Sequence, residues 1–167
     1  MDNGRELKRL CKLMNDEIYI FRQLLKIEKL KNSLIINQEI DELKKITAEE
    51  EKYLDEVAEK EKERESIVER LFRKYKVNSE KVLSTLIKIL PDDVGDIKQE
   101  LKQQKCELIR SIKDLKKMNV INNQLLMDSI KFFNYAVNSL QSIESITYTN
   151  GSEKNKYNKA QIIDRQV

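Results

Sequence analysis

Carboxylates are the side chains of this sequence whose number and spacing come closest to a catalytic or metal-binding arrangement. The densest run is Glu49-Glu50-Glu51, and paired carboxylates can act as a general acid and a general base. This run lies in a predicted helix with interspersed lysines, where solvated charge is the usual state of such side chains. The sequence also contains no histidine, the commonest general base and metal ligand. We therefore assign no catalytic residue and no metal ligand, and we do not expect an enzyme.

The two cysteines are the next candidates for chemistry. Cys11 and Cys106 stand alone, each in an amphipathic segment, which gives neither metal-ligand spacing nor a disulfide framework. No glycine-rich phosphate loop and no nucleophile-elbow motif accompanies them. We expect two buried thiols and no cofactor.

Glu61 and Arg64 are three residues apart at a spacing that should point inward, so they can pair on one face of a helix. A structural salt bridge, either one that sets helix register or one at the solvent edge, explains this pair better than a catalytic role.

The composition indicates the fold class. Charged residues make up 37% of the 167 positions, and there are only three glycines and one proline, which leaves little turn chemistry for sheets. Hydrophobic residues make up 40%, enough for the core of one domain. We predict an all-α protein, an elongated antiparallel helical bundle or coiled coil of three to four helices, with a long C-terminal helix and a flexible tail.

Charge and hydropathy narrow the cellular setting and the partners. The 32 basic and 29 acidic residues are well mixed, so the net charge of +3 creates no strong field that would attract nucleic acid. No run of eighteen apolar residues occurs, and the first residues lack the pattern of a signal peptide. We expect a cytoplasmic protein that does not bind nucleic acid and does not insert into a membrane.

Hydrophobic periodicity places the first two helices at about 4–36 and 47–75. Thr47 and Glu50 fit a capping box, which places the start of the second helix at Thr47. Five apolar residues of the second helix should face inward. They are Leu54, Val57, Ile67, Val68 and Leu71.

Proline separates the third predicted helix from the last. Asn78 or Ser79 can cap a short helix over 79–90, and Pro91 prevents its continuation. The last helix is predicted over 92–146. Residues 1–146 would then form the helical domain, and the polar, aperiodic segment 147–167 would form the tail.

The last helix carries a sustained heptad seam, which two asparagines interrupt. A buried asparagine at such a position typically fixes register or partner orientation, because its amide must find a partner away from water. The seam consists of Leu101, Leu108, Ile112, Leu115, Asn119, Asn122, Leu126, Ser129, Phe133, Ala136, Leu140 and Ile143.

Residues 118–140 contain more apolar surface than one neighbouring helix can cover. They include thirteen apolar side chains and only two charged ones, Asp128 and Lys131, whereas the 22 residues before them carry eleven charges. Surplus apolar surface of this kind typically marks a binding site. The other explanation is that the stretch is core, covered by the first and third helices. We expect that part of it is core and part is a binding site.

These residues also carry a resemblance to a known family. The string Asn119-x-x-Asn122-x-x-Leu125-Leu126-x-x-Ser129-Ile130-x-Phe132, followed by Tyr148-x-x-Gly151, resembles the FlgN family of flagellar export chaperones. The resemblance covers most of the chain. It includes the pair Glu61-x-x-Arg64, the short helix before Pro91 and the chain end Ile-Ile-Asp-Arg-Gln-Val.

The resemblance implies a cytosolic chaperone of flagellar type III export. Such a chaperone binds the terminal helical segments of the hook-filament junction (hook-associated) proteins, prevents their premature association and delivers them to the cytosolic domain of the export gate. Tyr148 matches the family tyrosine that contacts the gate. The implied client-binding residues are Asn119, Asn122, Leu125, Leu126, Ser129, Ile130, Phe132, Phe133, Val137 and Leu140.

An alternative function belongs to a different class of protein. A structural coiled-coil adaptor could self-associate through the same apolar stripe, with no client and no role in export. Oligomeric state distinguishes the two, because we expect the chaperone to be a monomer or a weak dimer.

Overall fold

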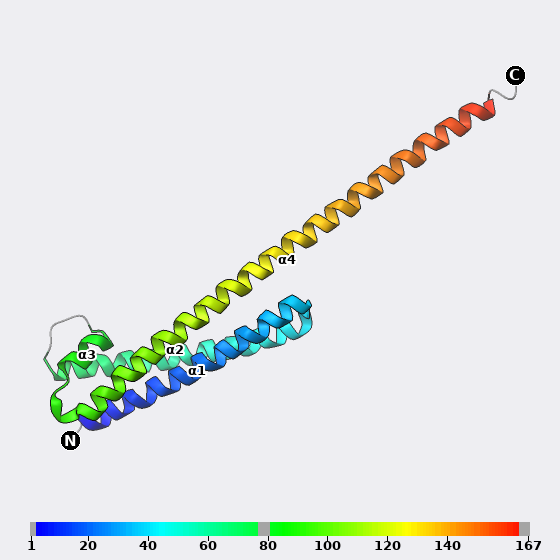
Figure 1. Ribbon diagram of the computed structural model, residues 1–167. Coiled ribbons are helices and arrows are strands. Elements are labelled where there is room, and N and C mark those ends of the chain that lie inside the picture. The colour runs from blue at the N-terminus through cyan, green and yellow to red at the C-terminus, as the bar shows by residue number, and fades with distance from the viewer. Residues whose placement is uncertain (1–2, 77–80, 164–167) are drawn as a thin grey trace. The chain divides into compact units, whose positions relative to one another are not determined.

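A computed structural model describes residues 3–76 and 81–163 of the chain (Figure 1). Side chains are described within these ranges from Gly4 to Leu140, except that of Asp92. The described residues form four α-helices and one short 3-10 helix, and they contain no strand. The all-α fold with a long last helix is therefore confirmed. The chain divides into two units, residues 1–123 and residues 124–167, which are described separately below.

An antiparallel hairpin of two helices forms the first part of unit 1. Helix α1 spans Asn3–Asn37 and helix α2 spans Ile40–Lys74. Between them Gln38 has a φ of 61°, in the left-handed region that ends many helices. Arg70 Nε donates to Glu6 Oε1 near one end of the hairpin. Lys31 Nζ pairs with Glu50 Oε2 near the other.

The predicted start of the second helix at Thr47 is wrong. Helix α2 begins at Ile40, so Thr47 lies in its second turn. The Thr47 hydroxyl donates to the carbonyl oxygen of Leu43, 2.8 Å away, as a threonine inside a helix often does. The residue before the helix, Glu39, makes no capping hydrogen bond with its side chain. The capping-box pattern at Thr47 and Glu50 therefore does not mark the start of α2.

A short helix follows the hairpin, and Pro91 marks its end as predicted. Helix α3 spans Leu83–Ile89, shorter than the predicted 79–90. The two predicted capping residues, Asn78 and Ser79, lie outside the described residues. After Pro91 a 3-10 turn, η1, covers Asp92–Val94.

The hydrophobic core of unit 1 joins α1, α2, α3 and the beginning of α4. Ile67, Val68 and Leu71 of α2 are buried as predicted, but Leu54 is 45% exposed, so its inward assignment is wrong. The buried cluster consists of Leu7, Leu10, Cys11, Leu13, Met14, Ile18, Ile67, Val68, Leu71, Phe72, Leu86, Ile87, Leu90, Leu101 and Leu108.

Helix α4 spans Gly95–Ile163 and continues past the end predicted at residue 146. Gly151 is the one glycine of this helix after its first residue. A single glycine costs a helix about 1 kcal/mol, which is not enough to end one. The backbone over 147–163 is thus helical, while 164–167 lie outside the described residues. The flexibility of the segment 147–167 stays a prediction.

Candidate functional site

Large apolar side chains are exposed along α4 over residues 124–140. Phe132 and Phe133 are 73% and 67% exposed. Met127, Ile130, Tyr135 and Leu140 are also exposed, while Leu125, Leu126, Ala136 and Val137 are partly exposed. No side chain described between 123 and 140 is buried. We call residues 124–140 the apolar segment.

Five residues of the apolar segment form a stripe along α4. They alternate at spacings of four and three residues, so they lie above one another on one side of the helix. The stripe consists of Leu126, Ile130, Phe133, Val137 and Leu140. This is the pattern with which a coiled-coil helix meets a partner helix.

Several polar side chains lie away from the stripe on the surface of the apolar segment, where Tyr135 is also exposed. Asp128 pairs with Lys131 over 3.6 Å and also accepts hydrogen bonds from Gln124. Asn134 and Asn138 are exposed near Lys131 on the helix surface. The two charges of this segment thus partly neutralise each other, and they leave the stripe uncharged.

The structure places the two seam asparagines differently. Asn119 is exposed, and its Oδ1 accepts a hydrogen bond from Asn123 Nδ2 at 2.9 Å. Asn122 is only 2% exposed and is the last buried residue of α4 among the described side chains. Asn122 is therefore nearly inaccessible to a client in this conformation. Ser129 is exposed, but its hydroxyl donates to the carbonyl oxygen of Leu125.

Two apolar residues of this segment were not among the predicted client-binding residues. Met127 and Tyr135 are as exposed as the predicted ones. The family resemblance from which the site residues were taken did not include them, although both lie in the apolar stretch 118–140. The side chain of Tyr148, the predicted export-gate contact, lies outside the described residues.

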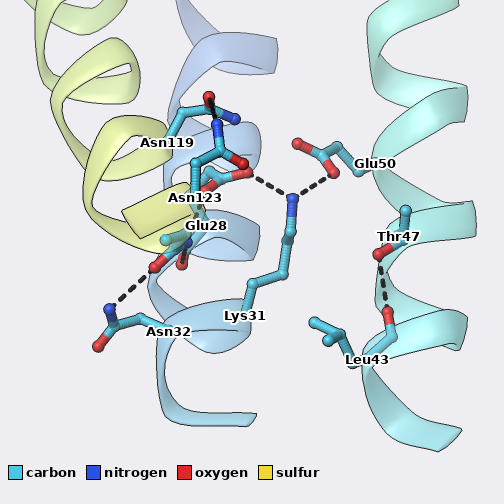
Figure 2. A network of polar contacts seen from close by, with 9 residues as sticks. Glu28, Lys31, Asn32, Leu43, Thr47, Glu50, Asn119 and Asn123 are labelled. Carbon is cyan, nitrogen blue, oxygen red and sulfur yellow. Dashed lines mark hydrogen bonds and ion pairs between the residues drawn. The ribbon is translucent and has the colours of Figure 1, made fainter. Parts of the chain in front are cut away.

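Within unit 1, a polar network around Glu28 and Lys31 joins α1 to α2 (Figure 2) and includes Asn122 of α4. Asn122 Nδ2 donates to the backbone oxygen of Glu28 at 2.7 Å and to Glu28 Oε2 at 2.6 Å. Asn32 Nδ2 donates to Asn122 Oδ1 at 2.8 Å. Lys31 Nζ lies between Glu28 and Glu50, 2.7 Å from an oxygen of each. Helices α1, α2 and α4 are thus connected by hydrogen bonds.

The charges of this network differ in their response to protonation. Burial acts to raise the pKa of Glu28, but the hydrogen bonds that it accepts from Lys31 and Asn122 lower it overall. Burial raises the pKa of Glu50, and the neighbouring Glu28 raises it further. Burial opposes the charge of Lys31, but hydrogen bonds to the two carboxylates raise its pKa overall. The network therefore holds a charged Glu28–Lys31 pair, with Glu50 the carboxylate that accepts a proton more readily.

A second buried charge pair lies further along the hairpin. Arg64 Nε donates to both oxygens of Glu17, at 2.9 and 3.1 Å. The predicted contact with Glu61 is present at 3.4 Å, but the Glu61 side chain is 58% exposed, so its inward assignment is wrong. Burial raises the pKa of Glu17, while Arg64 lowers it. The pair joins α1 to α2 and has the structural role expected for Glu61 and Arg64.

The cysteines have different environments. Cys11 is buried, and its burial, together with the nearby Glu100, raises the pKa of the thiol to about 12. Cys106 is exposed, so the prediction that both thiols are buried is wrong for this residue. Its amphipathic surroundings indicated a helix but did not indicate which face it would occupy.

Among the side chains that the structure describes between Gly4 and Leu140, no group of three or more cysteines and carboxylates is arranged to hold a metal ion. Over 3–76 and 81–163, no helix has the length and hydropathy needed to cross a membrane.

Comparison with known proteins identifies a family for this chain. The family model described as FlgN protein matches residues 1–156 of this chain. Searches of curated proteins and of solved structures found no match. The matched range includes both seam asparagines, the whole apolar segment and Tyr148.

Proposed function

We propose, because this chain belongs to the FlgN family of flagellar export chaperones, that its apolar segment holds a helical client. The proposed clients are the terminal helical segments of the hook-filament junction proteins. Binding would prevent their premature association in the cytoplasm. The observation that carries the proposal is the exposure of the stripe from Leu126 to Leu140.

The stripe suits a helix better than an extended peptide or a small molecule. A helix is recognised through anchors at spacings of three and four residues, and the stripe supplies such anchors without charge. An extended peptide that binds by strand addition needs an open sheet edge, and the described residues contain no strand. A client with a matching apolar face would bury it here instead of associating with another client.

Release needs no chemistry from the chaperone. A client that becomes ordered on binding loses conformational entropy, which offsets part of the free energy of the contacts. The resulting moderate affinity lets a competing site take the client. We propose that the cytosolic domain of the export gate is that site, with Tyr148 as a contact, and that the chaperone is a monomer or a weak dimer.

A calorimetric titration of the full chain against a fragment containing a junction protein's terminal helix tests this proposal. We expect saturable one-to-one binding. Phe133→Asp places a carboxylate in the centre of the stripe and should weaken binding at least tenfold, which corresponds to about 1.4 kcal/mol. Asn138→Asp is the matched control, since it adds the same charge away from the stripe and should leave the affinity nearly unchanged.

Three results would count against the proposal. No binding by a folded wild-type chain would exclude this client. Unchanged affinity of a folded Phe133→Asp variant would place the site elsewhere. A stable oligomer that dissociates on Phe133→Asp, without any client binding, would favour the self-associating adaptor.

A further inference from the structure

Two buried amide side chains of α4 donate hydrogen bonds to the backbone of α1. Gln104 Nε2 lies 3.1 Å from the carbonyl oxygen of Cys11, and Asn122 Nδ2 lies 2.7 Å from that of Glu28. Both amides are nearly inaccessible to solvent. In each pair the α4 residue is later in sequence by almost the same number, 93 and 94. The beginning of α4 therefore runs parallel to α1, and the two amides contact it at two separate points.

The buried and partly buried leucines of this part of α4 cannot by themselves select one axial position. Leu101, Leu108 and Leu115 recur every seven residues, so a shift of α4 by one heptad would exchange leucine for leucine. The amides do not repeat in this way. A shift of one heptad toward the C-terminus would bring Ile97 and Leu115 to the positions of Gln104 and Asn122. Glu28 would then lose its amide partner inside the bundle.

From these contacts we propose that Gln104 and Asn122 are positioning residues that fix the register of α4 along α1. One heptad corresponds to about 10 Å along a helix, far more than a hydrogen bond can tolerate. Both bonds break together in any shifted register. These polar contacts favour the native register, which the repeating leucines alone do not distinguish.

The stability cost of these amides agrees with such a role. Gln104 Oε1 is buried and has no hydrogen-bond partner among the described residues. An unpaired buried polar atom destabilises the fold, and a leucine in its place would fill the seam without this cost. Buried amides in helical seams are best known for specifying register at the expense of stability.

The register has a consequence for the client surface, on the premise that the proposed function is correct. Asn122 is the last buried described residue of α4, and the apolar segment follows directly. A heptad shift would change which α4 side chains are buried and would move the boundary of the client surface. The two amides would thus determine where along α4 a client can begin to bind.

Spin-label distance measurements on the chain without client test the proposal. One label is attached to the native exposed Cys106 and the other to an introduced cysteine, Lys29→Cys, at an exposed position of α1. Cys11 is buried and its thiol pKa is about 12, so it should resist labelling in the folded protein. With only these two labels attached, we expect a single distance between them. Gln104→Leu with Asn122→Leu should add a second population, displaced by about 10 Å.

Gln103→Leu with Asn123→Leu is the matched control, because it replaces two exposed amides next to the buried ones and should keep a single distance. If the folded variant with both Gln104→Leu and Asn122→Leu shows a single unchanged distance, the proposal is overturned. The connection at Pro91 would then fix the register. If the double variant does not fold, each single leucine variant should show a smaller second population, and its absence from both would overturn the proposal equally.

Client binding by the same variants is measured in a separate titration. Failure of the wild-type chain to bind client would refute the proposed function and leave the distance result intact.

Discussion

Arg64 and Glu17 illustrate how a single buried charge pair can matter more than many exposed ones. Glu17 is 2% exposed, and both of its oxygens accept hydrogen bonds from Arg64. Removing one partner of a buried pair leaves the other charge without compensation in a region of low dielectric. Arg9 and Glu63 form a contact between the same two helices, but both side chains are exposed there, and water screens their attraction.

We predict that Arg64→Ala lowers the free energy of unfolding by about 3 kcal/mol, because it leaves Glu17 buried and unpaired. Arg9→Ala, the matched control, should cost about 1 kcal/mol or less. Urea unfolding followed by circular dichroism measures both. Equal losses for the two variants would contradict the special role of the buried pair.

The sequence showed part of this pair but not its main contact. Glu61 and Arg64 lie on one helix, and their spacing alone predicts that they can meet. Glu17 lies on another helix, 47 residues away in sequence, and no local pattern connects it to Arg64. Cys106 was assigned to the interior for a related reason, since an amphipathic pattern indicates a helix more reliably than it assigns each residue to a face.

At the scale of the helices, the element types could be predicted and some of their ends could not. Pro91 fixes the end of α3 because its ring forbids a helical predecessor and it lacks an N–H. The start of α2 was misplaced because a threonine followed by a glutamate three residues later occurs inside helices as well as at their beginnings. The end of α4 was misplaced because polar residues with one glycine indicate a loop without excluding a helix.

The position of Thr47 within α2 gives a prediction at this scale. A threonine that caps a helix contributes about 1 kcal/mol, whereas one that donates to the carbonyl oxygen four residues earlier contributes little. Alanine also has the higher helix propensity. Thr47→Ala should therefore leave the melting temperature unchanged or raise it slightly. A fall of several degrees in a thermal melt would show that Thr47 acts as a cap.

At the scale of the whole molecule, the sequence predicted the all-α fold, the family and the apolar segment. It did not predict which part of the α4 seam is buried and which part is exposed. Periodicity treats Leu101 and Phe133 alike, because both are apolar residues at heptad positions. The structure separates them, since Leu101 is buried with α1 and α2 and Phe133 is exposed. Burial depends on which neighbours are present, and no local pattern contains that information.

Amide hydrogen exchange of the full chain, with and without the terminal helical fragment of a junction protein, tests the central claim most directly. A client helix that packs on the stripe should slow side-chain fluctuations and backbone opening there. We predict that bound client slows exchange over residues 124–140, while exchange over residues 101–122 of α4 stays the same. Slower exchange confined to α2 or α3, with none over 124–140 under saturating client, would contradict the account.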